Sequence, residues 1–269
     1  MELIGQKVET MAWQRPLLEL FLTLIHQMFD FCAKVWLCSN LLMKKLSSIR
    51  TDVRSNIKND FLEIDATKRN LTKIPNHIAF AFLESSISLH EVAQLVLWSI
   101  ACGAKGISLY DPPGFIKQQK PDLERMVNGY VRQLVNCVEN NQTFEISWNG
   151  IGGSNNGSRF TICLFSREDG QEDIVQAARK LAEDVAKGDL KVDDVNETRL
   201  EANLGSANKG LPDPEVLLRF GLAHSNQGYP PWQIRLSEIH DIDTHHGISP
   251  SDFLKVLLKY SRCEQRYGR

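Results

Sequence analysis

The sequence has no CxxC pair among its six cysteines and no excess of basic residues, and both absences exclude classes of function. Lys and Arg number 31 against 33 Asp and Glu, giving a formal charge of -2, so nothing favours nucleic acid as a partner. Scattered cysteines in a chain of 269 residues are typical of reduced, buried thiols facing the cytosol. They indicate neither a disulfide framework nor a zinc site.

A phosphate-binding glycine loop is also missing. The segment NGIGGSNNGS, residues 149–158, is rich in glycine but leads into an apolar, strand-like stretch. Phosphate loops place their ligand at the N-terminus of a helix, which this segment does not precede. We therefore expect a surface loop there.

The N-terminal segment carries the strongest apolar signal. Residues 17–43 would form a helix of about 40 Å, longer than the roughly 30 Å of a bilayer core. The stretch lacks a small-residue cleavage site, which excludes a signal peptide. Glu19, Asp30 and Lys34 interrupt it along one helical stripe, and charges at the centre of a span cost ~2.5–3.5 kcal/mol each.

We therefore predict a membrane-anchoring segment over residues 1–45, which either spans the bilayer or lies in its interface. More Lys and Arg follow the segment than precede it, which predicts a main domain facing the cytosol. The alternative is an amphipathic helix packed on a soluble core.

The rest of the chain alternates strand and helix patterns. Residues 46–70 are polar and predict a connector, and residues 71–269 predict one domain. Strands are expected at 74–82, 106–110, 144–148, 160–165 and 215–220, with helices at 88–102, 122–138, 173–187 and 249–263. Ser88 with Glu91, and Ser249 before Pro250, indicate helix starts. This order predicts an α/β fold with a mostly parallel central sheet flanked by helices.

Residues 212–238 carry the chemical information. Asp213-Pro214-Glu215 opens a strand that ends at Arg219, Trp232-Gln233 follows thirteen residues later, and Glu238 comes six residues after Trp232. These spacings resemble those of the cis-prenyltransferase (undecaprenyl diphosphate synthase) family. In that family the first-motif Asp and the late Glu hold the Mg²⁺ of the diphosphate leaving group, and a Gly-Glu-Arg-Ser loop holds phosphate.

The catalytic pattern is degenerate at the first metal-binding position and in the phosphate loop, so that Glu238 remains without an Asp partner. The resemblance puts Leu83 in the position of the Asp, and Phe220–Gln227 in the position of the phosphate loop, without its Glu and Arg. We therefore expect no catalytic residue and no metal ligand of its own in this chain. The degenerate positions are Leu83, Arg219, Ala223, Ser225 and Glu238.

The chain resembles more closely the non-catalytic, Nogo-B receptor type of subunit over about residues 71–269. In such complexes the C-terminal Arg-x-Gly motif reaches the partner's active site and helps hold substrate phosphate, which implies that role for Arg266, Tyr267 and Gly268. The alternative for this tail is ordinary helix-end chemistry, with Arg in the last turn and Gly just beyond it. The cluster from His240 to His246 matches no metal-ligand spacing and is expected to be a solvated loop.

The resemblance implies a required but non-catalytic subunit of a prenyltransferase complex in the endoplasmic reticulum membrane. The complex would join isopentenyl diphosphate to farnesyl diphosphate, making dehydrodolichyl diphosphate for dolichol synthesis and protein glycosylation. Mg²⁺ would be bound in the catalytic partner subunit, and membrane lipid would contact the N-terminal segment. The alternative is a membrane receptor or scaffold that keeps the fold without a role in synthesis.

Overall fold

The computed structural model describes most of the chain, in two compact units that are treated separately. The described residues are 19, 21–32, 34–36, 39, 57–137, 144–150, 158–205 and 211–264. The first unit comprises Met1–Val53 and the second Arg54–Arg269.

The described residues of the first unit are helical between Glu19 and Ser39. Taken by itself, this unit leaves its large apolar side chains exposed, with Phe29 and Phe31 both 67% accessible. No helix among the described residues is both long and apolar enough to cross a membrane. Much of the segment expected to anchor the chain, including residues 17, 18, 20, 33, 37, 38 and 40–43, lies outside the described residues.

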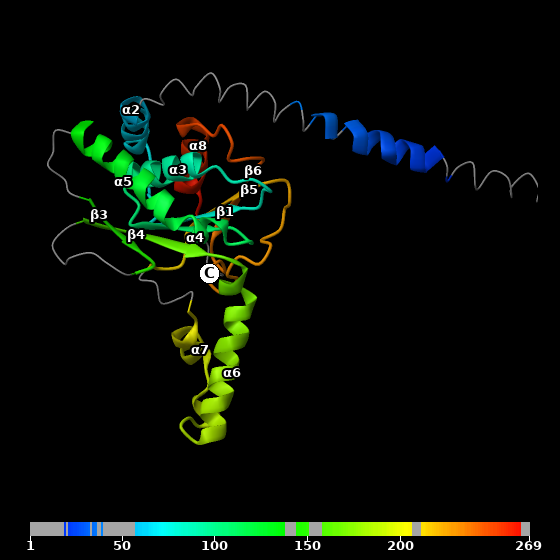
Figure 1. Cartoon of the computed structure of the whole chain (residues 1–269), viewed down its shortest axis with the longest axis vertical. Coiled ribbons are helices and arrows are strands. Elements are labelled where there is room, and N and C mark those ends of the chain that lie inside the picture. Colours follow the sequence, from blue (N-terminus) through cyan, green and yellow to red (C-terminus); the bar gives the residue numbers. More distant parts are fainter. Residues whose placement is uncertain are drawn as a thin grey trace, which may run out of the picture. The chain divides into compact units, whose positions relative to one another are not determined.

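The second unit is built on six strands, all parallel (Figure 1). They are β1 (His77–Phe82), β2 (Gly106–Tyr110), β3 (Phe144–Trp148), β4 (Ser158–Phe165), β5 (Val216–Phe220) and β6 (Glu238–Ile242). Their order in the sheet is β3-β4-β2-β1-β5-β6. The first five were predicted; β6 was missed, because its alternation of Glu, His and Asp does not resemble a buried strand.

The two faces of the sheet carry different side chains. Ile78, Phe80 and Phe82 of β1 point into the larger core, while Ala79 and Ala81 point into a smaller one with Tyr110 and Tyr229. Both faces are covered, which explains the nearly continuous apolar runs of the central strands. The predicted α/β fold with a parallel sheet flanked by helices is confirmed.

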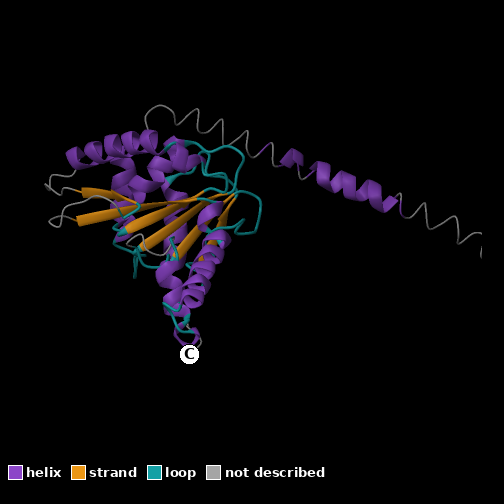
Figure 2. Cartoon of the chain, turned by 60° about the horizontal axis from the view of Figure 1, so that its bottom comes forward, coloured by secondary structure: helices purple, strands orange, loops and turns teal. Residues whose placement is uncertain are grey.

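The larger core lies under one layer of helices, and two further helices lie away from this layer, on the opposite side of the sheet (Figures 1 and 2). The first layer contains α2 (Ile57–Lys68), α3 (Leu89–Cys102), α5 (Lys120–Cys137) and α8 (Pro250–Arg262). The long α6 (Gln171–Lys187) packs against α7 (Glu197–Asn203) and both extend away from the sheet. The short α4 (Phe115–Gln118) precedes α5.

The helix ends follow the sequence only in part. Ser249 and Asp252 form the capping box of α8, and Gly103 ends α3 with a left-handed backbone at φ 97°. The capping box expected at Ser88 is not formed, because the Ser88 side chain makes no cap hydrogen bond. Glu91 instead accepts the backbone N–H of Gly247 at 2.9 Å.

The segment expected to be a connector, residues 46–70, contains α2. Ile64 of α2 is fully buried, and Asp60 accepts a hydrogen bond from the Trp98 indole at 3.2 Å. Burial raises the pKa of the Asp60 carboxyl, and the bond from Trp98 opposes this. Helix α2 thus packs into the larger core of the second unit.

Candidate functional site

The strand order predicts where a ligand would bind in such a sheet. Strands β2, β4 and β3 lie on one side of β1, whereas β5 and β6 lie on its other side. The direction in which strands are added to the sheet therefore reverses between β1 and β5. In open α/β sheets, ligands bind at this reversal, beyond the carboxyl ends of the strands. The candidate site is therefore bounded by Leu83, which follows β1, and by Arg219 and Gly221 at the end of β5.

Leu83 closes this position. Its N–H donates to the carbonyl of Phe220 at 2.8 Å, and its side chain packs against the smaller core. A Cβ on Gly221, whose φ is +122°, would lie 3.2 Å from the Leu83 carbonyl carbon and oxygen. The backbone of Gly221 and the side chain of Leu83 thus lie at the position where a diphosphate would need a carboxylate and a metal ion.

Arg219 is held by protein groups. Its Nε lies 2.7 Å from Asp241 Oδ1 and its Nη2 lies 3.0 Å from Asp241 Oδ2, which is a bidentate pair. Nη1 donates to Asn226 at 2.9 Å, and only 12% of the Arg219 side chain is accessible. The hydrogen bonds from Arg219 are the main cause that lowers the pKa of the Asp241 carboxyl. The guanidinium is thus paired with Asp241 and Asn226.

Glu84 and His245 form a buried pair that the sequence analysis missed. The Glu84 carboxylate is bonded to Nδ1 of His245, a fully buried ring, and Ser88 N–H donates to His245 Nε2 at 2.9 Å. The expectation of a solvated loop is therefore wrong for His245. Phe82 of β1, Phe220 of β5 and the N-terminus of α3 contact the ring, which no local pattern in residues 240–246 could indicate.

Glu84, His245 and His246 offer ligand atoms within 4.8 Å of one another. Both ring nitrogens of His245 are already engaged, one with Glu84 and one with the N–H of Ser88. A metal-bound histidine normally donates its second nitrogen to an acceptor, whereas here that nitrogen faces a donor. The cluster therefore joins β1, α3 and the segment after β6.

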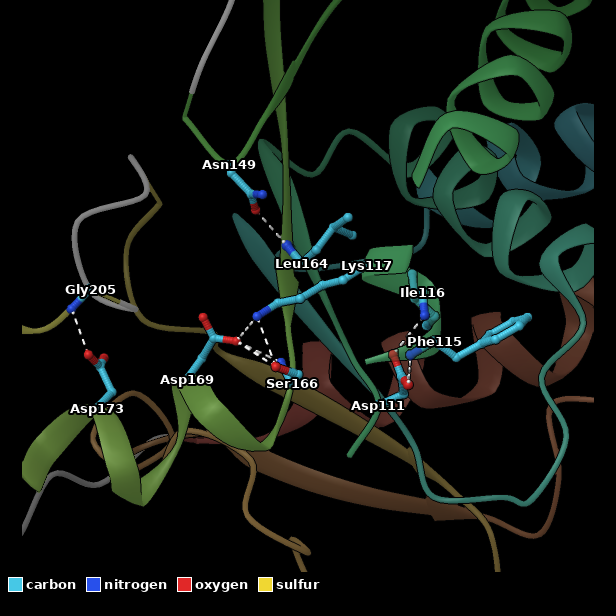
Figure 3. Close-up of polar contacts among 10 residues, drawn as sticks. All are labelled: Asp111, Phe115, Ile116, Lys117, Asn149, Leu164, Ser166, Asp169, Asp173 and Gly205. Atoms are coloured by element: carbon cyan, nitrogen blue, oxygen red, sulfur yellow. Dashed lines mark hydrogen bonds and ion pairs between the residues drawn. The ribbon is translucent and has the colours of Figure 1, made fainter. Parts of the chain in front are cut away.

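The carboxyl ends of β2 and β4 meet in a second polar network (Figure 3). Asp111, fully buried, accepts the N–H groups of Phe115 at 2.5 Å and Ile116 at 3.0 Å, and so starts α4. Lys117 donates to Ser166 Oγ at 2.9 Å and pairs with Asp169. These groups satisfy one another, so they position helices and leave no carboxylate pair for a metal ion.

A groove of about 620 Å³ runs along α6 beside the loop that follows β5. Its lining includes two guanidinium groups and one carboxylate, with Arg167, Gln171, Glu172, Val175, Arg179, Gln227 and Gly228 as its residues. Gln171, Val175 and Arg179 share one face of α6 because they lie four apart, and Arg167 lies in the 3-10 turn that precedes the helix. The sequence analysis did not single out this groove.

Glu238 lies at the opposite end of the strands, where their amino ends meet. It is the first residue of β6 and is level with Val216, the first residue of β5. Val216 is level with Ile78 of β1 and Leu83 lies five residues beyond Ile78, so about 17 Å separates the two positions along the strands. One chain does not bring them to a common ion, although the resemblance implies that both positions serve one metal.

The C-terminal end of α8 is at the same edge as Glu238. Thr72 and Lys73, which precede β1, bond to the carbonyls of Ser261 and Cys263. The Glu238 carboxylate is the main cause that raises the pKa of the Cys263 thiol. Arg266, Tyr267 and Gly268 lie outside the described residues, three to five positions beyond Cys263.

The remaining degenerate positions offer little to an anion. Ala223 is half-buried and Ser225 is exposed, in the irregular segment between β5 and β6. Since Leu83 has no ligand atom and the neighbouring Glu84 is bonded to His245, the carboxyl edge does not fit a Mg²⁺ site for a diphosphate.

The expectation that the cysteines are reduced and buried is met in part among those that the structure describes. The described cysteines are free; Cys102 and Cys163 are buried, as expected, whereas Cys32 and Cys263 are exposed. Burial raises the pKa of the Cys102 thiol to about 11.

Comparison with known proteins supports the resemblance. Residues 140–268 match the family model described as putative undecaprenyl diphosphate synthase. The mouse protein named dehydrodolichyl diphosphate synthase complex subunit Nus1 is 34% identical over 208 residues, covering 76% of this chain and 69% of the mouse protein. Its yeast (Saccharomyces cerevisiae) counterpart is 27% identical over 205 residues, covering 67% of this chain and 53% of that protein.

A solved structure supports the fold alone. The structure of lavandulyl diphosphate synthase from Lavandula x intermedia matches with a TM-score of 0.52 and 22% identity, covering 72% of this chain and 98% of the other. Together with the mouse and yeast relatives, the retained sheet and degenerate carboxyl edge identify the branch. The chain belongs to the dehydrodolichyl diphosphate synthase complex subunits, within the undecaprenyl diphosphate synthase family.

Proposed function

We propose that this protein is the non-catalytic subunit of a heteromeric cis-prenyltransferase that makes dehydrodolichyl diphosphate from farnesyl and isopentenyl diphosphates for dolichol synthesis. The degenerate carboxyl edge of the sheet carries the proposal. Leu83 stands at the position of the family's metal-binding Asp, and Arg219, which would otherwise bind phosphate, is paired with Asp241. Mg²⁺ would be bound in the catalytic partner, where it would stabilise the diphosphate leaving group.

The free edge of β6 supports the assembly. Among the described strands β6 pairs only with β5, so its other side has unpaired backbone groups. Beside it, Leu236 is 65% accessible and Ile239 is 38% accessible. Exposed apolar side chains along an open strand edge are features of an interface, and we assign this surface to the catalytic subunit.

The position of the C-terminal end of α8 supports the same assembly. The C-terminal end of α8 and Glu238 share one edge of the sheet, beside β6. A partner docked on β6 would therefore lie close to the point where Arg266, Tyr267 and Gly268 begin. The tail would complete the partner's phosphate site by supplying a guanidinium fork and a backbone without a Cβ.

The N-terminal segment would hold the complex on the endoplasmic reticulum membrane, with the main domain in the cytosol. The apolar side chains that the first unit leaves exposed, Phe21, Leu24, Phe29, Phe31 and Trp36 among them, support lipid as their environment.

Assays of each subunit alone and of the mixture test the proposal. The purified chain should transfer no prenyl group, and adding it to a catalytic cis-prenyltransferase subunit should raise turnover in the presence of Mg²⁺. Ile239→Lys should weaken the heterodimer about tenfold or more, because it places a charge in an apolar contact. Val192→Lys, at an exposed valine beyond α6, is the matched control. Turnover by the chain alone, or a mixture no more active than the partner, would refute the proposal and favour the receptor or scaffold alternative.

A further inference from the structure

Two residues before β1 fasten the last residues of α8. Thr72 Oγ1 donates to the carbonyl of Ser261, and Lys73 Nζ donates to the carbonyl of Cys263 at 2.7 Å. The Lys73 ammonium also lies 4.3 Å from the centroid of the Tyr260 ring. Thr72 and Lys73 are separated from α8 by about 190 residues of sequence, so this contact is made by the fold.

The chemistry of a helix end explains why these contacts hold. The last four carbonyls of a helix lack partners within the helix, and its C-terminus favours positive charge. Thr72 and Lys73 donate to two of the carbonyls at this end, and Lys73 brings the charge. We call Thr72 and Lys73 the Cys263 anchor.

The anchor limits where the tail can go. Three residues extend at most about 11 Å, so the Cα of Arg266 stays within that distance of the Cα of Cys263. A fixed starting point raises the effective concentration of the tail at a nearby partner site, because a short tether samples a small volume. Loosening Cys263 would lower that concentration without removing any group from the tail.

We propose that Lys73 is a positioning residue for the partner's reaction, which fixes Cys263 so that Arg266 is delivered to the partner's substrate phosphate. The inference rests on the proposed function and deepens it. A residue that merely caps α8 would affect the stability of this domain and nothing else. A positioning residue affects turnover through Arg266.

A double-mutant cycle on the complex separates these roles. The full chain carrying Lys73→Met, Arg266→Ala or both is mixed with the catalytic subunit, and kcat/KM for isopentenyl diphosphate is measured. Lys73→Met should lower kcat/KM about three- to tenfold in the otherwise unchanged chain, and should have no further effect once Arg266 is Ala, because coupled residues are non-additive. Lys73→Arg keeps the charge and the donors and should restore most of the loss.

Two controls accompany the cycle. Lys259→Met removes a positive charge from the same last turn of α8 and, among the described residues, Lys259 is not part of the Cys263 anchor, so it should leave turnover unchanged. The thermal midpoint and heterodimer affinity of each variant establish that it folds and assembles. No loss with Lys73→Met, or an equal loss with and without Arg266, would overturn the positioning role alone. An unchanged chain that fails to stimulate the partner would instead overturn the proposed function, and this inference with it.

Discussion

Acid should destabilise this domain through one buried histidine, His77. His77 is 4% accessible at the start of β1, where its Nδ1 lies 2.6 Å from the Pro212 carbonyl. Its Nε2 lies 3.0 Å from Ser108 Oγ, which in turn lies 2.8 Å from the hydroxyl of Tyr229. In the neutral ring, Nδ1 donates to the Pro212 carbonyl and Nε2 accepts from Ser108, so both contacts are satisfied without a charge.

The pKa of His77 sets the size of the effect. Burial is the main cause that lowers it from 6.5 to about 4, and the bond to Pro212 opposes this. Because the folded pKa lies below the unfolded one, folding favours the neutral ring. Its contribution is full above pH 6.5 and is lost as the pH falls toward 4. At 1.36 kcal/mol per pKa unit, about 3 kcal/mol of the free energy of unfolding should disappear between pH 7 and pH 4.

Urea unfolding of the full chain at several pH values measures this loss. His77→Gln should be less stable at pH 7 by about 1–3 kcal/mol, because it leaves buried partners unsatisfied, but should lack the histidine part of the pH dependence. His224→Gln, at an exposed histidine, should retain it. Since carboxyl groups also titrate in this range, the informative quantity is the difference in slope between the two variants. Equal slopes would show that His77 is not held neutral.

Three further outcomes are expected. Arg266→His or Gly268→Ala should lower turnover of the complex at least about tenfold, with heterodimer yield unchanged, and full turnover from a chain ending at Gln265 would contradict this. Asp241→Asn should lower the free energy of unfolding by about 1–2 kcal/mol through loss of the bidentate pair, as measured by urea unfolding, and should create no activity in the isolated chain. Residues 17–43 should keep the full chain on membranes in high salt; alkaline carbonate extraction then distinguishes a spanning helix, which stays in the pellet, from an interfacial one, and a fully soluble chain would contradict both.

The sequence by itself determined the class of fold and the loss of the catalytic pattern. Apolar runs such as residues 77–82 predict buried strands because both faces of a parallel sheet are covered, and Gly103 and Ser249 mark helix ends through local backbone chemistry. The absence of an Asp at Leu83 is a fact of composition at one position, and it needs no structure to be recognised once the motif spacing is known.

Only the tertiary structure decided which groups are free to act. Arg219 is paired with Asp241 because β5 and β6 lie side by side, and His245 is buried because β1 and α3 cover it. Glu238 is placed at the amino edge, beside Cys263, by the direction of β6 and α8. These contacts join residues up to 190 positions apart. Local propensity and spacing say nothing about such pairs, because the packing of the whole sheet and its helices determines them.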